Sequence, residues 1–248
     1  MRLRLYVVPG SHPCLAVEQA LRLKGLDHKV TELPQGLHFV HQRLRFGRPT
    51  VPSLTADGEK VAGSVAIMRR LEELQPEPSL YPAERREEVE RAEEWGNDVL
   101  QDVPRRVLWW ALRKRPDAMP SFLANSRLPL PRAVVPLVGR AIAPIEFRMN
   151  GVTEEAVQAA VASLPEHLAE VDRLIDEGVI GGDQPNAADL QIASSLALLR
   201  TMGDLAPLVD ASRGGELAKR LFPDYPGSIP PGTLSGVPAR RTPSSTGS

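Results

Sequence analysis

The sequence predicts an α/β unit over residues 1–75 followed by an all-helical unit over residues 83–222. In the first part, short runs rich in β-forming residues alternate with amphipathic stretches. Residues 75–82 contain three prolines, and such a connector is stiff. After this connector only helical periodicity is found, so the two parts of the chain follow different patterns.

The first elements form a strand, a helix and a second strand. Leu3–Val8 is a short β-forming run that a Pro-Gly pair ends. Pro13 suits the first turn of a helix, and apolar residues at helical spacing continue until Gly25 stops it. His28–Leu33 is predicted to be the second strand. Because a helix joins the two strands, we expect them to run parallel with a right-handed crossover.

A hairpin and a second helix complete the α/β unit. The segment between the second strand and residue 51 is predicted to be irregular. Residues 52–63 indicate a β-hairpin with Asp57 and Gly58 as its turn. Ser64 is predicted to cap a helix that ends at Leu74, because apolar residues recur between them at helical spacing.

The second part is predicted to contain long helices over residues 83–103, 152–178 and 186–202. Pro104 is expected to kink or end the first of these. From Pro223 the composition turns to Pro, Gly, Ser and Thr. We therefore expect residues 223–248 to form a disordered tail unless they pack against the body.

Composition excludes several classes of protein. The formal net charge of −1 gives no overall attraction to nucleic acid or to an anionic membrane. A single cysteine cannot form an intramolecular disulfide or a multi-cysteine zinc site, and no metal is expected. The N-terminal apolar run is too short for a signal peptide, and no stretch approaches the roughly 18 apolar residues of a membrane helix. We expect a cytoplasmic protein.

Four short motifs along the chain contain the candidate functional residues. The first is Ser11-His12-Pro13-Cys14, where the first strand gives way to a helix. Val51-Pro52 precedes the hairpin, and Gly63-Ser64 precedes the next helix. Asn186–Leu190 has the pattern of an N-capping box before a largely apolar helix. In this order and spacing, over about residues 3–200, the motifs resemble the glutathione transferase superfamily, with a theta-like start.

The resemblance implies a thioredoxin-like N-terminal part followed by an all-helical part. It also implies a homodimer that detoxifies small apolar electrophiles by joining them to glutathione, its co-substrate. Ser11 would then be the catalytic residue that stabilises the glutathione thiolate. Lowering a thiol pKa from ~8.5 to ~6.5 requires about 2.7 kcal/mol, which a helix N-terminus and a serine hydroxyl can supply together.

The resemblance further implies the residues that bind glutathione. A cis bond before Pro52 would turn the Val51 backbone toward the cysteinyl part of the peptide. Ser64 would bind the γ-glutamyl carboxylate at a helix start. His41 and Arg48 lie in the basic segment where the family binds the glycine carboxylate.

One departure leaves alternatives open. The family has Glu or Gln before this serine, but here the residue is Gly63. A non-catalytic ligand-binding or interaction module with the same fold is therefore a second hypothesis. Cys14, the only cysteine, is the candidate nucleophile of a third hypothesis, a glutathionyl or disulfide exchange enzyme.

Overall fold

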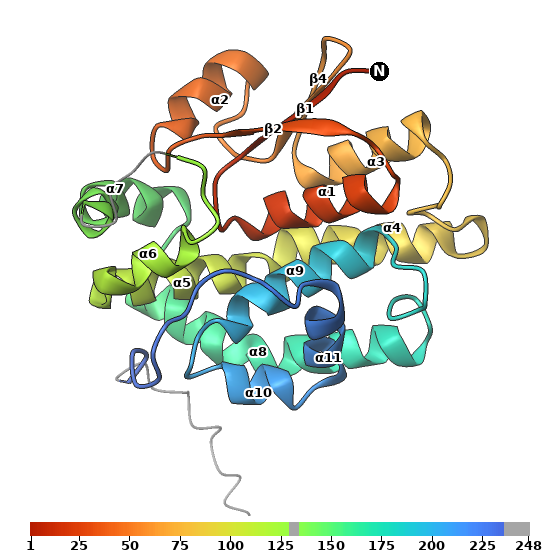
Figure 1. Cartoon of the computed structure of the whole chain (residues 1–248). Coiled ribbons are helices and arrows are strands. Elements are labelled where there is room, and N and C mark those ends of the chain that lie inside the picture. Colours follow the sequence, from red (N-terminus) through yellow and green to blue (C-terminus); the bar gives the residue numbers. More distant parts are fainter. Residues whose placement is uncertain (129–133, 236–248) are drawn as a thin grey trace, which may run out of the picture.

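The computed structural model describes residues 1–128 and 134–235 (Figure 1). Its N-terminal part contains one four-stranded sheet with the strand order β2-β1-β3-β4. The strands β1 and β2 run parallel, as predicted, whereas β3 is antiparallel to both β1 and β4. Their bounds are β1 Leu3–Val7, β2 His28–Glu32, β3 Ser53–Ala56 and β4 Glu59–Ala62.

Helices cover both faces of this sheet. Alternate residues of β1 point to opposite sides, so Leu5 joins the main core with α1 (His12–Leu23) and α3 (Ser64–Leu74). Tyr6 points the other way and packs with Phe46 of α2 (His38–Phe46). The four-stranded mixed sheet with these helices confirms the thioredoxin-like prediction.

The helix α2 corrects the prediction of an irregular segment. Three apolar residues at helical spacing, Leu37, Val40 and Leu44, are exposed rather than buried. The inner side of this helix presents His38 and Gln42, which are buried polar residues. The pattern therefore lacks the polar-outside, apolar-inside alternation by which a surface helix is recognised.

Pro104 does not end the helix in which it lies. The chain passes from α4 (Arg86–Trp95) through one π-helical turn, η2 (Gly96–Leu100), into α5 (Asp102–Lys114). A regular helix would bring the proline ring against the carbonyl four residues earlier. The wider turn accommodates it, with the Gln101 N–H donating to the Gly96 carbonyl at 3.0 Å.

The helical remainder is organised around α9 (Ala187–Arg200), which packs against α1, α4 and α11 and is buried from Ala187 to Leu199. Its predicted capping box is confirmed: the Asp189 N–H donates to Asn186 Oδ1 at 3.1 Å, and the Asn186 N–H donates to Asp189 Oδ2 at 2.9 Å. The remaining elements are η1 Ala83–Arg85, η3 Pro116–Ala118, α6 Met119–Phe122, α7 Val135–Met149, α8 Glu154–Asp176, α10 Ala206–Asp210 and α11 Arg213–Leu221.

The C-terminal segment corrects the prediction of a disordered tail up to residue 235. Ile229 is 2% exposed, and its backbone exchanges hydrogen bonds with Thr201 and Gly203 at 2.8 and 2.9 Å. The Tyr225 hydroxyl donates to the Gly10 carbonyl at 2.8 Å. Ordering this segment costs conformational entropy, and its composition alone predicts that this cost is not offset. The long-range contacts offset it. Residues 236–248 of the predicted tail lie outside the described residues.

Within residues 1–128 and 134–235, no helix is both long enough and apolar enough to span a bilayer.

Candidate functional site

Ser11 occupies the N-cap of α1 with its hydroxyl free of any capping bond. Its carbonyl accepts the Cys14 and Leu15 N–H groups, both at 3.1 Å, and its side chain makes no cap hydrogen bond. The first turn of α1 contains no acidic residue that would neutralise the positive end of the helix dipole. The Ser11 hydroxyl and the positive end of the helix dipole can therefore stabilise an anion.

The register of the sheet gathers the sequence motifs at one end. Tyr6, near the end of β1, pairs with Ser53 at the start of β3, and Ser53 pairs with Ala62 at the end of β4. The motif that begins with Ser11 follows β1, Val51-Pro52 directly precedes β3, and Gly63-Ser64 directly follows β4. Ser11, Pro52 and Ser64 therefore lie at the same end of the sheet.

The peptide bond between Val51 and Pro52 is cis, as the resemblance implies. The Pro52 carbonyl accepts the Gly63 N–H at 3.0 Å, which ties this loop to the start of α3. Gly63 is the residue before the helix and has φ +96°, a conformation that side-chain-bearing residues rarely adopt. Ser64 is thus the first helical residue rather than the cap, and it is buried.

Two polar side chains accompany Ser64. The Ser64 hydroxyl donates to Asn97 Oδ1 at 3.5 Å, and Asn97 comes from the π-helical turn η2. A Cβ atom placed on Gly63 would lie 4.0 Å from Arg48 Nη1. The Arg48 guanidinium thus lies beside the position where the family carries Glu or Gln.

His41 lies elsewhere on the N-terminal part. Its ring packs against Tyr6, with the ring centroids 5.6 Å apart, on the face of the sheet that α2 covers. Its Nδ1 atom is buried without a hydrogen-bond partner. The structure therefore brings together Pro52, Gly63, Ser64 and Arg48, and it gives His41 a packing contact.

Cys14 is buried beneath Ser11, with 2% of its surface exposed. Burial raises the pKa of the Cys14 thiol to about 12, although hydrogen bonds involving Ser11 and Val8 oppose the shift. The thiolate is the nucleophilic form of cysteine, so this side chain is unreactive at neutral pH. The geometry disfavours a Cys14-dependent exchange reaction.

Arg105 of α5 is a charged residue that the motifs did not reveal. It lies close enough to His12 and Cys14 to influence both, and its Nη1 is 3.9 Å from Asp102 Oδ1. Burial, together with this positive charge, holds the pKa of His12 well below its usual value. His12 is therefore a neutral, buried imidazole, and Arg105 adds positive charge next to the start of α1.

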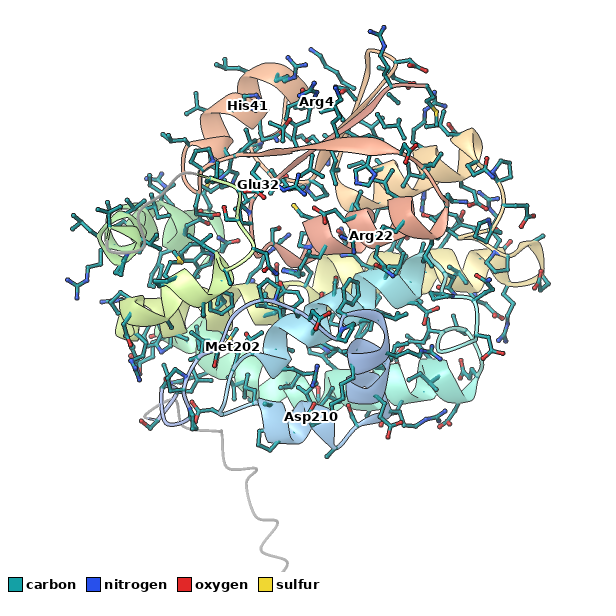
Figure 2. All side chains as sticks on the ribbon, viewed as in Figure 1. Arg4, Arg22, Glu32, His41, Met202 and Asp210 are labelled. Carbon is teal, nitrogen blue, oxygen red and sulfur yellow. The ribbon has the colours of Figure 1, made fainter. Side chains whose placement is uncertain are left out.

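A cavity of about 1100 Å³ opens beside the N-terminus of α1. Ser11 and Cys14 line one end of it, while Val51, Pro52 and Ser64 do not line it. Its walls come from α1, β2 and residues 122–127 and 220–226, and Figure 2 shows Arg22 of α1 and Glu32 of β2 on two of them. The charged residues lining it are Arg4, Glu18, Arg22, Lys29, Glu32, Arg127, Arg220 and Asp224.

A smaller cavity of about 360 Å³ lies between α5 and α7. It is lined mainly by apolar side chains, among them Trp109, Leu112, Met119 and Phe147. This cavity is the better fit to a small apolar molecule, because few charged groups face it.

The segment between α5 and α8 holds the loops around Ser11 in place. A Cβ atom on Gly10 would lie 3.0 Å from the Phe122 carbonyl oxygen, so residue 10 must be small. Glu32 accepts hydrogen bonds from the Ser126 hydroxyl and the Arg127 N–H at 2.9 and 2.7 Å. The Gln35 amide donates to Glu146 of α7. Contacts from Phe122, Ser126, Arg127 and Glu146 therefore hold the loop before α1, the end of β2 and the loop that follows β2.

Comparison with known proteins finds a family match for the N-terminal part and structural likeness over most of the chain. Residues 5–79 match the family model of the glutathione S-transferase N-terminal domain. Among curated proteins, no sequence matches the chain significantly. A glutathione S-transferase from Rhodospirillum rubrum F11 is similar in structure with a TM-score of 0.59 and 24% identity, over 94% of this chain and 98% of that one.

Two further structures are similar over nearly their full lengths. The β-etherase LigF from Sphingobium sp. strain SYK-6 has a TM-score of 0.56 and 22% identity, covering 90% of this chain and 99% of that one. FzlA from C. crescentus has a TM-score of 0.58 and 18% identity, covering 98% and 95%. At these identities the likeness establishes the fold and leaves the activity open.

Proposed function

We propose that the chain is a glutathione transferase-like enzyme, because residues 5–79 match the family model of the glutathione S-transferase N-terminal domain. It would join the thiolate of glutathione to small apolar electrophiles. The observation that carries the proposal is Ser11, whose hydroxyl makes no capping bond and lies at a helix N-terminus without acidic residues in its first turn. Ser11 also shares one end of the sheet with the cis Val51-Pro52 bond and with Ser64.

Glutathione binding would use three groups at that end of the sheet. The Val51 backbone would pair with the cysteinyl part of the peptide, and Ser64 would bind the γ-glutamyl carboxylate at the start of α3. Arg48 lies beside Gly63, which supports a role for its charge at the same γ-glutamyl end. The binding of the glycine carboxylate by His41 stays a prediction.

In the reaction, Ser11 would hold the sulfur after its proton leaves. The Ser11 hydroxyl would donate to the thiolate, and the α1 N-terminus and Arg105 would lower the pKa of the bound thiol. The thiolate would then form a C–S bond with the electrophilic carbon, while the leaving group departs with its electron pair. The apolar cavity between α5 and α7 suits the electrophile. The resemblance further supports a homodimer in the cytoplasm.

Replacing Ser11 by Ala tests the proposal. We expect the Ser11→Ala variant to lose about a hundredfold in kcat/KM with an activated aryl chloride, because one donor to the anion is removed. The pKa of bound glutathione, followed by thiolate absorbance, should rise in parallel. Cys14→Ala is the control and should keep its activity. Unchanged turnover in Ser11→Ala would remove this residue from the mechanism.

A non-catalytic binding module is the second candidate, and Gly63 favours it because a side chain that grips glutathione is missing. The large charged cavity beside α1 would then hold the ligand. Binding of small molecules that does not depend on any thiol, in a protein without transferase activity, would favour this candidate.

A further inference from the structure

The large apolar side chains that remain exposed are concentrated on two helices. Of the eleven such residues in the described chain, eight lie in α2, in α7 or directly before one of them. The exposed fraction reaches 83% at Leu44 and 68% at Leu137. The eight residues are Leu37, Val40, Leu44, Val134, Leu137, Val138, Ile145 and Met149.

The helix α7 is apolar on both of its sides. Its inner side packs on the helical part, where Gly139 approaches Met119 and where Phe147 lines the apolar cavity. Its outer side carries exposed apolar residues at positions 134, 137, 138, 145 and 149, a stripe with helical spacing. A helix that is apolar all round is normally covered on both sides. Among the described residues, 1–128 and 134–235, none covers this apolar stripe on the outer side of α7.

The loop directly before α2 contacts α7. A Cβ atom on Gly36, just before α2, would lie 2.7 Å from Ile142 Cγ2 of α7. Gln35 and Glu146 are hydrogen-bonded across the same junction. Figure 1 shows α7 at the left edge of the molecule and α2 above it, at the upper left. We define the α2–α7 face as the eight exposed apolar residues above with the exposed arginines Arg43, Arg45, Arg140 and Arg148.

This face is positively charged although the whole chain is not. Arg43, Arg45, Arg140 and Arg148 take part in none of the ion pairs of the described residues. The single carboxylate of the two helices, Glu146, is only 3% exposed. The chain as a whole has a formal charge of −1, but this face carries apolar and cationic groups and no exposed acid.

We propose that the α2–α7 face docks onto the surface of an anionic phospholipid bilayer. Apolar side chains on an exposed helix can enter the boundary between headgroups and acyl chains, while flanking arginines reach the lipid phosphates. A second copy seated on the same face would bring its arginines against those of the first, which like-charge repulsion disfavours. None of the exposed apolar residues of the outer stripe lines the cavity beside α7, whereas Arg140 of the face does.

Sedimentation with lipid vesicles tests the proposal on the full chain. We expect binding to phosphatidylcholine vesicles that contain about 30 mol% phosphatidylglycerol, and weak binding to phosphatidylcholine alone. Higher salt should release the protein, because screening weakens the contribution of the arginines.

Two variants of the α2–α7 face, each with a control variant elsewhere, test whether this face binds the vesicles. Leu137→Glu combined with Ile145→Glu should abolish vesicle binding, whereas Leu208→Glu on α10 should leave it unchanged. Arg148→Ser should weaken binding about fivefold, and Arg91→Ser, on the exposed side of α4, should not. Circular dichroism checks that each variant folds.

Three results would overturn the proposal. The wild-type protein could ignore anionic vesicles at low salt, or the double variant could bind them as well as the wild type does. Finally, the wild type could fail to bind vesicles and sediment as a dimer, while the double variant sediments as a monomer. In that case the face belongs to a second copy of the chain.

Discussion

Glu146 is expected to make the stability of this protein fall as the pH rises from about 4.5 to about 7. Its carboxyl is buried at the junction between α7 and the loop before α2, where it accepts hydrogen bonds from Gln35 and, at 3.1 Å, from Asn150. Burial raises the pKa of Glu146 to about 7 from an ordinary value of 4.5, against these hydrogen bonds and the charge of Arg105.

The sign and size of the effect follow from proton linkage. Between the two pKa values the folded state keeps its proton while the unfolded chain releases it, so stability is lost as the pH rises through this window. The difference of 7 − 4.5 = 2.5 pH units corresponds to at most about 3.4 kcal/mol. Glutamine at this position cannot ionise and keeps one carbonyl acceptor in place of the two carboxyl oxygens.

Urea denaturation at about pH 5 and about pH 8 measures the effect. We expect wild-type protein to lose up to about 3 kcal/mol more stability between these values than the Glu146→Gln variant does. Glu166→Gln, an exposed position on α8, is the matched control and should behave as the wild type. Equal pH dependence in the wild type and Glu146→Gln would refute the assignment of a buried neutral carboxyl.

Two further predictions concern buried charged or reactive groups. Because burial raises the pKa of Cys14 to about 12, iodoacetamide should modify it far more slowly than free cysteine at neutral pH in folded protein, and equal rates would restore it as a candidate nucleophile. Lys24 has a fully buried side chain that binds Glu72 at 2.6 Å and the Gln75 and Pro78 carbonyls at 2.6 and 2.9 Å. Lys24→Met should lower the free energy of unfolding by about 3–5 kcal/mol in chemical denaturation, and a loss below about 1 kcal/mol would show that these contacts contribute little.

Local sequence patterns correctly predicted the elements whose structure depends on residues close together along the chain. The Asp57-Gly58 turn fixed the hairpin, with φ +48° and +99° at the two residues, and the spacing of apolar residues placed α3 correctly from Ser64 to Leu74. The capping box of α9 was also visible, because Asn186 and Asp189 are three residues apart. These features depend on neighbours along the chain, so the sequence alone reveals them.

Features that depend on distant contacts were not predicted. The helix α7 carries apolar residues on both sides, which conceals its periodicity, and the order of the segment around Ile229 depends on Thr201 and Gly203. Asn97 and Arg105 reach the candidate site because the π-helical turn and α5 pack beneath it. No local signal marks either residue, since each belongs to a charged helical pattern that is typical of a solvent-exposed surface.

We propose that the N-terminal part of the chain binds a peptide thiol at Ser11, the cis Val51-Pro52 bond and Ser64. The first experiment is calorimetric titration of the folded wild-type protein with reduced glutathione. We predict a dissociation constant in or below the low millimolar range, which corresponds to about −4 kcal/mol or better. The absence of any heat of binding, in a protein shown to be folded, would contradict the claim and would favour the binding-module alternative.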